Sequence, residues 1–307
     1  MTLVLAHPEC RNHVTPEGHP ERVARLDAVE QGLLGLAVTR REAPLGSEAE
    51  VLRVHAAAHW DAVAAGEPAA GLNPMDADTW MSPGSFRAAL RAVGGAGAAV
   101  DAVLTGEARN AFVACRPPGH HATRAATMGF CLFGNVAIAA KRALDHHGLG
   151  RVAIVDFDVH HGNGTQDLLW DEDRVLFVSS HQMPLWPGSG DPAERGAHGQ
   201  IVNIPLRPGS GGAEMRAVYD DRVFPALAAF EPDLVLISAG FDAHAADPLA
   251  GLMWHEADYA WLTQRLCDVA AAHAGGRVVS VLEGGYDLGA VSASVAAHVG
   301  VLAERAA

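Results

Sequence analysis

Cysteine is scarce in this sequence and follows no pattern. The 307 residues hold four cysteines, at positions 10, 115, 131 and 267, and no two of them form a Cys-x-x-Cys pair. This spacing argues against a disulfide framework and against a thiolate zinc site, and it fits reduced cytosolic thiols. The amino terminus has neither a basic region nor a cleavage site, and Arg or Asp interrupts the longest apolar stretches. We therefore expect a cytoplasmic protein that is neither secreted nor membrane-spanning.

Basic residues and linkers are also in short supply. Lys and Arg number 22 against 36 Asp and Glu, which gives a formal net charge of −14. That balance argues against sequence-independent binding of nucleic acid and is compatible with a cationic substrate. Apolar runs alternate with Ala/Leu-rich helical segments, without a charge block or a long Ser/Pro-rich segment between them, so we expect one α/β domain over residues 1–307. The oligomeric state stays open, a homo-oligomer included.

What the sequence does contain is a set of five short apolar runs, each followed by polar residues. The runs cover residues 111–115, 152–155, 175–179, 234–238 and 278–282. They are typical of buried parallel strands, whose carboxyl ends lie along one edge of a sheet where loops form the ligand crevice. We therefore expect the clusters that follow them to converge, namely His120 with His121, the segment 156–160, Ser180 with His181, Asp242, and Tyr286.

The stretch 152–165 carries the first chemical signal. Asp158 and His160 are two residues apart, so in extended backbone both side chains leave one face of the strand, and Asp156 joins them if the strand continues. A carboxylate and an imidazole on one face form half of a transition-metal site. A lone Asp-x-His more often marks a solvated strand end, so this interpretation depends on the other four clusters.

Two helix starts can be predicted from local residue preferences. The Gly-Asn-Gly turn at 162–164 predicts a helix that begins near Thr165, with this threonine as its N-cap. Ser82 and Pro83 predict a second start, with the serine at the N-cap and the proline at the first helical position.

Five motifs, taken in order, resemble the zinc-dependent histone deacetylase family. They are R-P-P-G-H-H (116–121), G-F-C (129–131), D-F-D-V-H-H-G-N-G (156–164), A-G-F-D-A-H-A-A-D-P-L (239–249) and E-G-G-Y (283–286). The H-H-G-N-G and E-G-G-Y forms are similar to the class II branch and to bacterial deacetylase-like and acetylpolyamine amidohydrolases. The resemblance runs from about His7 to Tyr286. It implies a three-layer arginase/deacetylase-like fold, with a central, mostly parallel sheet flanked by helices.

The resemblance implies one catalytic zinc ion on Asp158, His160 and Asp242. Two carboxylates and one imidazole suit a divalent metal and leave positions open for water and substrate. Manganese is the alternative, because the binuclear arginases share the fold. Their additional aspartates are missing here, notably at Asn163, so one metal is favoured over two.

Carried over to the matching residues, the family's reaction is amide hydrolysis by metal-activated water. His121 would be the principal general base and acid, with His120 as its electrostatic partner. Asp156 should hold His120, while Asn163 should hold His121 more weakly than an aspartate would. The hydroxyl of Tyr286 would bond the oxyanion of the tetrahedral intermediate. Relatives with histidine at that place are weak deacetylases, so tyrosine favours a competent enzyme.

The same resemblance assigns a substrate channel. Trp186, in a Pro- and Gly-rich loop, would face Phe130 across a narrow tunnel beside Gly129, although a tryptophan that only pins the loop to the core is the plain alternative. Asp76 or Asp78 on the rim would bind a substrate backbone amide or amine, although capping or solvation is the more common role of such residues. A polyamine-specific branch has an acidic residue at the place of Leu249, so an apolar residue there disfavours polyamines without excluding them.

Three further residues are candidates for the site or its surroundings. Arg25 takes the place of an arginine that lies beneath the family's active site, with a surface position as the alternative. His244 and Asp247 are second-tier candidates for the site.

A potassium ion beneath the zinc is implied by the resemblance alone. Its ligands would be backbone oxygens of Asp156, Asp158, His160 and Ser180, with the side chains of Asp156 and Ser179.

These implications favour a zinc-dependent amidohydrolase that removes acetyl or related acyl groups from an acetylated amine. Acetyl-lysine, an acetylpolyamine and a small acetylated metabolite all fit this description. A non-catalytic module that binds acyl-lysine and an amidohydrolase specific for acetylpolyamines are the alternatives. The complete set of metal ligands, with His121 and Tyr286, favours the enzyme.

Overall fold

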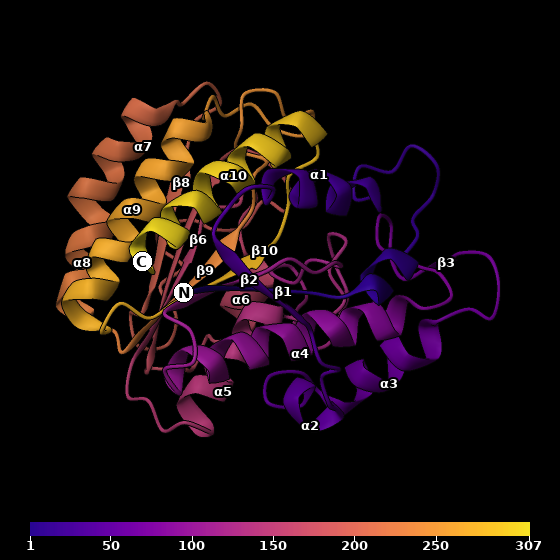
Figure 1. The fold of residues 1–307 in the computed structure, drawn as a ribbon. Coiled ribbons are helices and arrows are strands. Elements are labelled where there is room, and N and C mark those ends of the chain that lie inside the picture. Colours follow the sequence, from indigo (N-terminus) through magenta and orange to yellow (C-terminus); the bar gives the residue numbers. More distant parts are fainter.

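A computed structural model describes residues 1–307, and an eight-stranded parallel sheet forms its centre (Figure 1). The strand order is β2-β1-β5-β10-β9-β6-β7-β8, and every neighbouring pair in it is parallel. The predicted α/β class with a parallel sheet between helices is confirmed. The strands are β1 (Thr2–Ala6), β2 (Val38–Glu42), β5 (Asn110–Val113), β6 (Val152–Asp156), β7 (Val175–Gln182), β8 (Ile201–Leu206), β9 (Leu234–Ala239) and β10 (Val278–Leu282).

The five apolar runs are the five adjacent strands β5, β10, β9, β6 and β7, so the sequence locates the middle of the sheet. It does not identify β1 and β2 on one side or β8 on the other. The residues of β2, V-T-R-R-E, are mostly exposed, so this strand lacks the apolar run that marks a doubly covered strand. Strand β7 continues to Gln182, so Ser180 and His181 lie within it rather than after it.

Helices cover both faces of the sheet, and successive strand residues point to opposite faces. Ile154 packs in a core with α4 (Ser85–Leu104) and α5 (Asn135–Asp145), whereas Ala153 and Val155 pack in a second core on the other face. Burial on both faces explains why the inner strands are continuously apolar. The second core is covered by α1 (Ala24–Gly32), α8 (Phe224–Phe230), α9 (Glu256–His273) and α10 (Leu288–Arg305).

Shorter elements complete the chain. A single 3₁₀ turn precedes α1, and a π-helical turn joins α7 to α8. The bounds are η1 (Pro8–Asn12), α2 (Glu48–Val51), α3 (Ala57–Gly66), the antiparallel pair β3 (Asn73–Pro74) and β4 (Trp80–Met81), α6 (Asn163–Leu168), α7 (Gly212–Val218) and η2 (Tyr219–Val223).

Both predicted helix starts were wrong by two or three residues. Helix α6 begins at Asn163 with Gly162 at its N-cap, so Thr165 lies inside the helix and its buried hydroxyl has no hydrogen-bond partner. Helix α4 begins at Ser85, and Gly84 takes the N-cap position with a φ of +93°. A tertiary contact explains the second error. The hydroxyl of Ser82 accepts the N–H of Val14 at 2.8 Å and is thereby withdrawn from capping.

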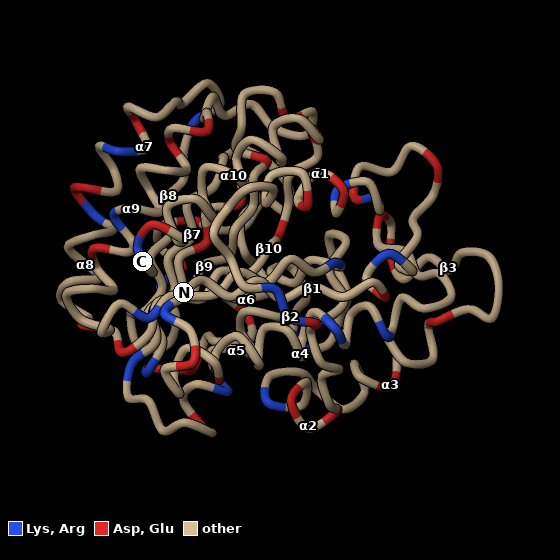
Figure 2. The backbone as a smooth tube through the Cα atoms, viewed as in Figure 1, with Lys and Arg blue, Asp and Glu red and all other residues tan.

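Charged residues of both signs are interspersed over the outer helices and loops (Figure 2). All four cysteines are free and buried. No helix combines the length and the apolar character that crossing a membrane would require.

His298 of α10 is fully buried against the sheet. Its Nδ1 lies 2.6 Å from the hydroxyl of Thr263, and its Nε2 lies 2.8 Å from the hydroxyl of Ser280. The rings of Phe112 and Phe157 pack around it. Burial lowers the pKa of this imidazole from 6.5 to about 3, so the folded protein keeps the ring neutral.

This burial predicts a loss of stability in acid. The folded pKa lies below the unfolded one, so as pH falls from 6.5 toward 3 only the unfolded chain binds the proton and the free energy of unfolding decreases. The contribution of His298 reaches about 1.4 kcal/mol per pH unit. His298→Gln retains polar atoms but does not titrate, so its free energy of unfolding should fall less steeply. Urea unfolding of both proteins at about pH 6, 5 and 4 measures the slopes, and equal slopes would contradict the prediction.

Candidate active site

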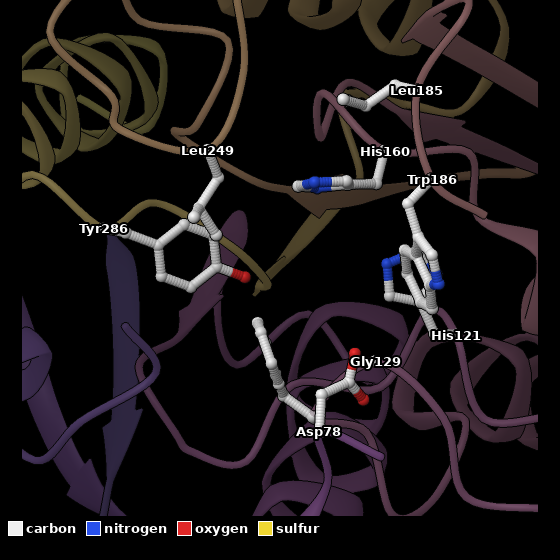
Figure 3. A pocket seen from close by; sticks show the side chains of 9 residues that line it. Asp78, His121, Gly129, His160, Leu185, Trp186, Leu249 and Tyr286 are labelled. Atoms are coloured by element: carbon white, nitrogen blue, oxygen red, sulfur yellow. The ribbon is translucent and has the colours of Figure 1, made fainter. Parts of the chain in front are cut away.

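A cavity of about 220 Å³ opens at the carboxyl edge of the sheet (Figure 3). All five residues predicted to contact substrate line it, together with His121, His160 and Tyr286. Leu185 also lines it, and this role could not be predicted because a single leucine in an irregular loop carries no pattern. The lining residues are Asp78, His121, Gly129, Phe130, His160, Leu185, Trp186, Leu249 and Tyr286.

Three buried side chains could hold a metal ion at this cavity: Asp158 and His160 after β6, and Asp242 after β9. Nδ1 of His160 lies 3.1 Å from an oxygen of Asp158 and 3.2 Å from an oxygen of Asp242. A proton on Nδ1 of His160 can be donated well to only one of these two oxygens. A divalent cation, in contrast, can bind the nitrogen and both oxygens at once. Burial and the charge of Asp158 raise the pKa of Asp242 to about 7, so a neighbouring cation would favour its ionised form. The donor set therefore fits a metal.

Asp158 and His160 meet for a different reason from the one expected. Strand β6 ends at Asp156, and the next residues bend rather than continuing as a strand. Oδ1 of Asp156 accepts the N–H of Asp158 at 3.0 Å, and Oδ1 of Asp158 accepts the N–H of His160 at 2.9 Å. The carboxylates themselves therefore shape the turn that brings the two ligands together.

Backbone amides orient the two carboxylates from outside the ligand group. Oδ2 of Asp158 accepts the N–H of Gly284 at 2.8 Å, and Oδ1 of Asp242 accepts the N–H of Val159 at 2.8 Å. A Cβ atom at Gly284 would lie 2.2 Å from Oδ2 of Asp242, so only glycine lets the backbone approach this closely. The segment that carries Tyr286 is thus packed directly against the ligands.

The two histidines of R-P-P-G-H-H differ in charge. Nδ1 of His120 lies 2.9 Å from Asp156, and Nδ1 of His121 lies 2.7 Å from Oδ1 of Asn163, as the sequence predicted. Burial lowers the pKa of His120, but the charges of Asp158 and Asp156 outweigh it and hold this pKa well above the usual value. Burial and the charge of His120 hold the pKa of His121 well below the usual value. His121 is therefore neutral, and with Nδ1–H donated to Asn163 its Nε2 lone pair is free.

The hydroxyl of Tyr286 points into the cavity (Figure 3). Burial and the charge of Asp242 raise the pKa of this phenol well above its usual value, so it remains a hydrogen-bond donor. Arg25 lies 5.1 Å from the centre of the Tyr286 ring, and its Nε donates to the carbonyl of Gly285 at 2.6 Å. Arg25 is fully buried, so the alternative of a surface arginine was wrong.

Aromatic side chains form the walls of the cavity. The ring of Trp186 meets His121 edge to face at 4.7 Å, and 41% of the residue is exposed, so it does not serve as a core anchor for its loop. The ring of Phe130 meets Tyr286 edge to face at 5.8 Å. Asp78 lines the cavity, where burial and the neighbouring Asp76 raise its carboxyl pKa.

Glu283 is a residue of the site for which we predicted no role. It is fully buried, and its carboxylate accepts the N–H of Gly119 at 2.7 Å and the N–H of His120 at 3.1 Å. Its other oxygen accepts the hydroxyl of Ser238 at 3.2 Å. Glu283 therefore joins the histidine loop to β9. The available signal was its place in E-G-G-Y, since a glutamate directly after an apolar strand faces the same edge as the other polar clusters.

Three of the residues proposed for potassium, Asp156, Ser179 and Ser180, lie side by side on β6 and β7. Ser179 and Ser180 are buried beside Asp156, and the hydroxyl of Ser180 lies 3.5 Å from the Asp156 carbonyl and 2.7 Å from the hydroxyl of Tyr219. The hydroxyl of Ser179 lies 3.1 Å from Nδ1 of His181.

A second group, His244 with His255 and Glu256, is poorly suited to a metal. Nδ1 of His244 accepts the N–H of Ala246 at 3.0 Å, so the neutral ring carries its proton on Nε2, the atom that lies 3.4 Å from Glu256. That nitrogen then has no lone pair to offer a cation. Asp247 bonds backbone amides instead of joining either group.

Comparison with known proteins identifies the family. A family model described as the histone deacetylase domain matches residues 19–302. The chain belongs to the histone deacetylase family. The match supports deacetylase, and hence hydrolase, activity.

Several relatives are similar over nearly the whole chain. A probable deacetylase of Archaeoglobus fulgidus is 40% identical over 94% of this chain and 82% of its own length. The human polyamine deacetylase HDAC10 is 39% identical over 98% of this chain but 46% of its own length. The crystal structure of the HDA15 HD domain matches with a TM-score of 0.93 and 36% identity, covering 99% of this chain and 90% of that one. The chain spans about half the length of its longer curated relatives.

Close packing around Gly129 predicts that replacing this glycine with alanine destabilises the protein. A Cβ atom there would lie 2.4 Å from the Trp186 ring and 2.6 Å from the His121 ring, at a φ of +54°. Gly188 provides a matched control, because its φ is +85° and its Cβ would have no neighbour within 4 Å. Both Ala variants carry the left-handed cost of about 1–2 kcal/mol. Gly129→Ala should lose more stability than Gly188→Ala in thermal unfolding, and equal losses would mean that the cavity wall is not packed as described.

Proposed function

We propose that residues 1–307 form one catalytic domain that hydrolyses the amide bond of an acetylated amine with water activated by zinc on Asp158, His160 and Asp242. The observation that carries the proposal is that this ligand group, the neutral imidazole of His121 and the hydroxyl of Tyr286 meet at one cavity. Together they supply a Lewis-acid site, a base and an oxyanion donor, which amide hydrolysis requires. The central sheet takes its strands from residues 2 to 282, which supports one domain.

The donor set favours one zinc ion. Three protein ligands with further positions open are typical of catalytic zinc. Bound there, zinc would polarise the acetyl carbonyl and lower the pKa of a bound water. A binuclear manganese site needs more carboxylates, and the nearby Asn163 instead accepts a hydrogen bond from His121 at 2.7 Å.

The histidine pair divides two tasks. Nε2 of His121 takes the proton of the attacking water and later gives it to the departing amine. His120, whose Nδ1 lies 2.9 Å from Asp156, would contribute positive charge that opposes the negative charge of the tetrahedral intermediate. General acid–base catalysis of this kind contributes about 10²–10⁴-fold to the rate.

Tyr286 supplies the oxyanion donor. Its hydroxyl stays protonated and projects into the cavity, so it can bond the oxygen on which charge develops. Packing of the ring between Phe130 and Arg25 restrains its direction. A donor fixed before reaction is more effective than one that must reorganise.

The walls favour an aliphatic acylated chain as the substrate. Phe130, Trp186, Leu185 and Leu249 make the cavity largely apolar, which suits the methylene chain of acetyl-lysine or of a small acetylated amine. Asp78 at the mouth can accept an N–H of the substrate. The apolar Leu249 stands where the polyamine branch has an acidic residue, so a polyamine is the less favoured substrate.

A structural potassium ion is proposed beneath the zinc, held by backbone oxygens of Asp156, Asp158, His160 and Ser180 and by the side chains of Asp156 and Ser179. Burial and the charge of Asp158 raise the pKa of Asp156 against the opposing effect of His120, so an additional cation would stabilise its ionised form. The ion would take no part in proton transfer.

Metal analysis tests the ligand assignment. Asp242→Ala should bind zinc at least about 10- to 100-fold more weakly, since losing an outer partner alone costs that much. His255→Ala is the matched control, because it alters the second His/Glu group and should leave the zinc content unchanged. Dialysed proteins can be compared by mass spectrometry for metals. Zinc retained by Asp242→Ala, or lost from His255→Ala, would overturn the assignment.

Release of acetate from a panel of acetyl-lysine peptides, acetylpolyamines and small acetylated amines tests the function. Tyr286→Phe should lower kcat by about 10²–10³, or about 2.7–4 kcal/mol, because it removes one oxyanion donor. Zinc content and KM should stay nearly unchanged, since the hydroxyl acts mainly in the transition state. Tight binding without turnover by the wild-type protein would instead identify a non-catalytic acyl-binding module.

A further inference from the structure

Asp247 occupies a position that neither the metal site nor the proposed chemistry uses. It follows β9 in A-G-F-D-A-H-A-A-D-P-L, and only 7% of the residue is exposed. Its amide donates to the carbonyl of His244 at 2.9 Å, which fixes its own backbone. A buried carboxylate is costly unless its oxygens accept hydrogen bonds, so its partners indicate what it does.

The two carboxylate oxygens of Asp247 accept backbone N–H groups from two residues whose side chains line different walls of the cavity. Oδ1 accepts the N–H of Leu249 at 3.0 Å, and Oδ2 accepts the N–H of Tyr286 at 2.8 Å. Leu249 and Tyr286 are 37 residues apart in sequence, and both side chains line the same cavity. One side chain therefore connects the apolar wall with the proposed oxyanion donor.

Asp247 restrains the main chain of Tyr286 at the peptide unit that joins it to Gly285. Arg25 and Phe130 contact the ring, and Arg25 also holds the preceding carbonyl of Gly285. Gly285 has a φ of +115°, so the chain just before the tyrosine has wide conformational freedom. The carbonyl of Gly285 and the N–H of Tyr286 belong to one peptide unit, so Arg25 and Asp247 hold its two ends and together fix the backbone directly after that glycine.

We infer that Asp247 is a positioning residue that sets the place of the Tyr286 hydroxyl relative to the Leu249 wall. The inference rests on the proposed function, in which Tyr286 is the oxyanion donor. A carboxylate suits the task because it offers acceptors on both oxygens, whereas an amide offers one acceptor and turns a donor toward the other N–H. Misplacement of a reacting group by about 1 Å costs up to about 10²-fold in rate.

Asp247→Asn tests the inference, and Asp233→Asn is its matched control. Asp233 also accepts two backbone amides, those of Gly150 and Arg151, but it precedes β9 at the opposite edge of the sheet. Asp247→Asn should lower kcat by about 10- to 100-fold with unchanged zinc content. Asp233→Asn should leave kcat unchanged, and Asp247→Glu, which keeps both acceptor oxygens, should lose less activity than Asp247→Asn. Equal kcat values for wild type and Asp247→Asn would overturn the inference.

A double-mutant cycle separates positioning from general destabilisation. If Asp247 acts through the hydroxyl of Tyr286, adding Asp247→Asn to Tyr286→Phe should change kcat less than about twofold, because the group being positioned is already absent. A loss of folded protein would lower activity by the same factor in both backgrounds. Additive effects would therefore overturn the inference.

Hydrogen exchange provides a measurement that does not depend on activity. In Asp247→Asn, the amide of Tyr286 or that of Leu249 should exchange faster, while amides of β9 keep their protection. Unchanged exchange at both amides would show that Asp247 does not hold them. If the wild-type protein hydrolyses no acetylated amine, the proposed function fails, and this exchange experiment still decides whether Asp247 connects the two walls.

Discussion

Four fully buried carboxylates at the carboxyl edge of the sheet are the constraint on which this site depends. Burying an ionised carboxylate is strongly unfavourable without hydrogen bonds or cations. Each of the four accepts at least one backbone N–H, and the donors belong to the loops that carry the reactive groups. The loops are therefore ordered by the need to satisfy the carboxylates. The four are Asp156, Asp158, Asp242 and Glu283.

The same buried carboxylates give the adjacent residues His120 and His121 different protonation states. His120 faces Asp156 directly and lies 3.7 Å from Asp158, so the surrounding carboxylates keep it protonated despite burial. Its positive charge, added to burial, then keeps His121 neutral. Asn163 in place of a second aspartate reinforces the difference, because an amide bonds the ring of His121 without a charge that would favour its protonation.

The strands that are buried on both faces could be predicted from the sequence. The predictions failed where contacts between distant residues determine the local structure. The inner strands and their polar ends could be predicted because burial on both faces demands continuous apolar runs. Strand β2, exposed along most of its length, has no such run. The candidate ligands Asp158 and His160 were predicted correctly as neighbours but for the wrong reason, since carboxylate hydrogen bonds bend the chain beyond Asp156. Ser82 failed as a cap because its hydroxyl bonds Val14, a residue distant in sequence.

A second buried charge cluster holds the Tyr286 segment from the amino-terminal side. Glu21, Arg25 and Arg116 are fully buried, with Arg116 bonding both oxygens of Glu21 and Arg25 bonding one of them at 2.9 Å. Such buried pairs contribute little net stability, because desolvation offsets their attraction. What this cluster does provide is a fixed guanidinium, whose remaining donors bond the carbonyls of Glu283 and Gly285. Segments far apart in the chain thus set the direction of one phenol, and a hydrogen-bond donor fixed in advance stabilises a developing charge without reorganisation.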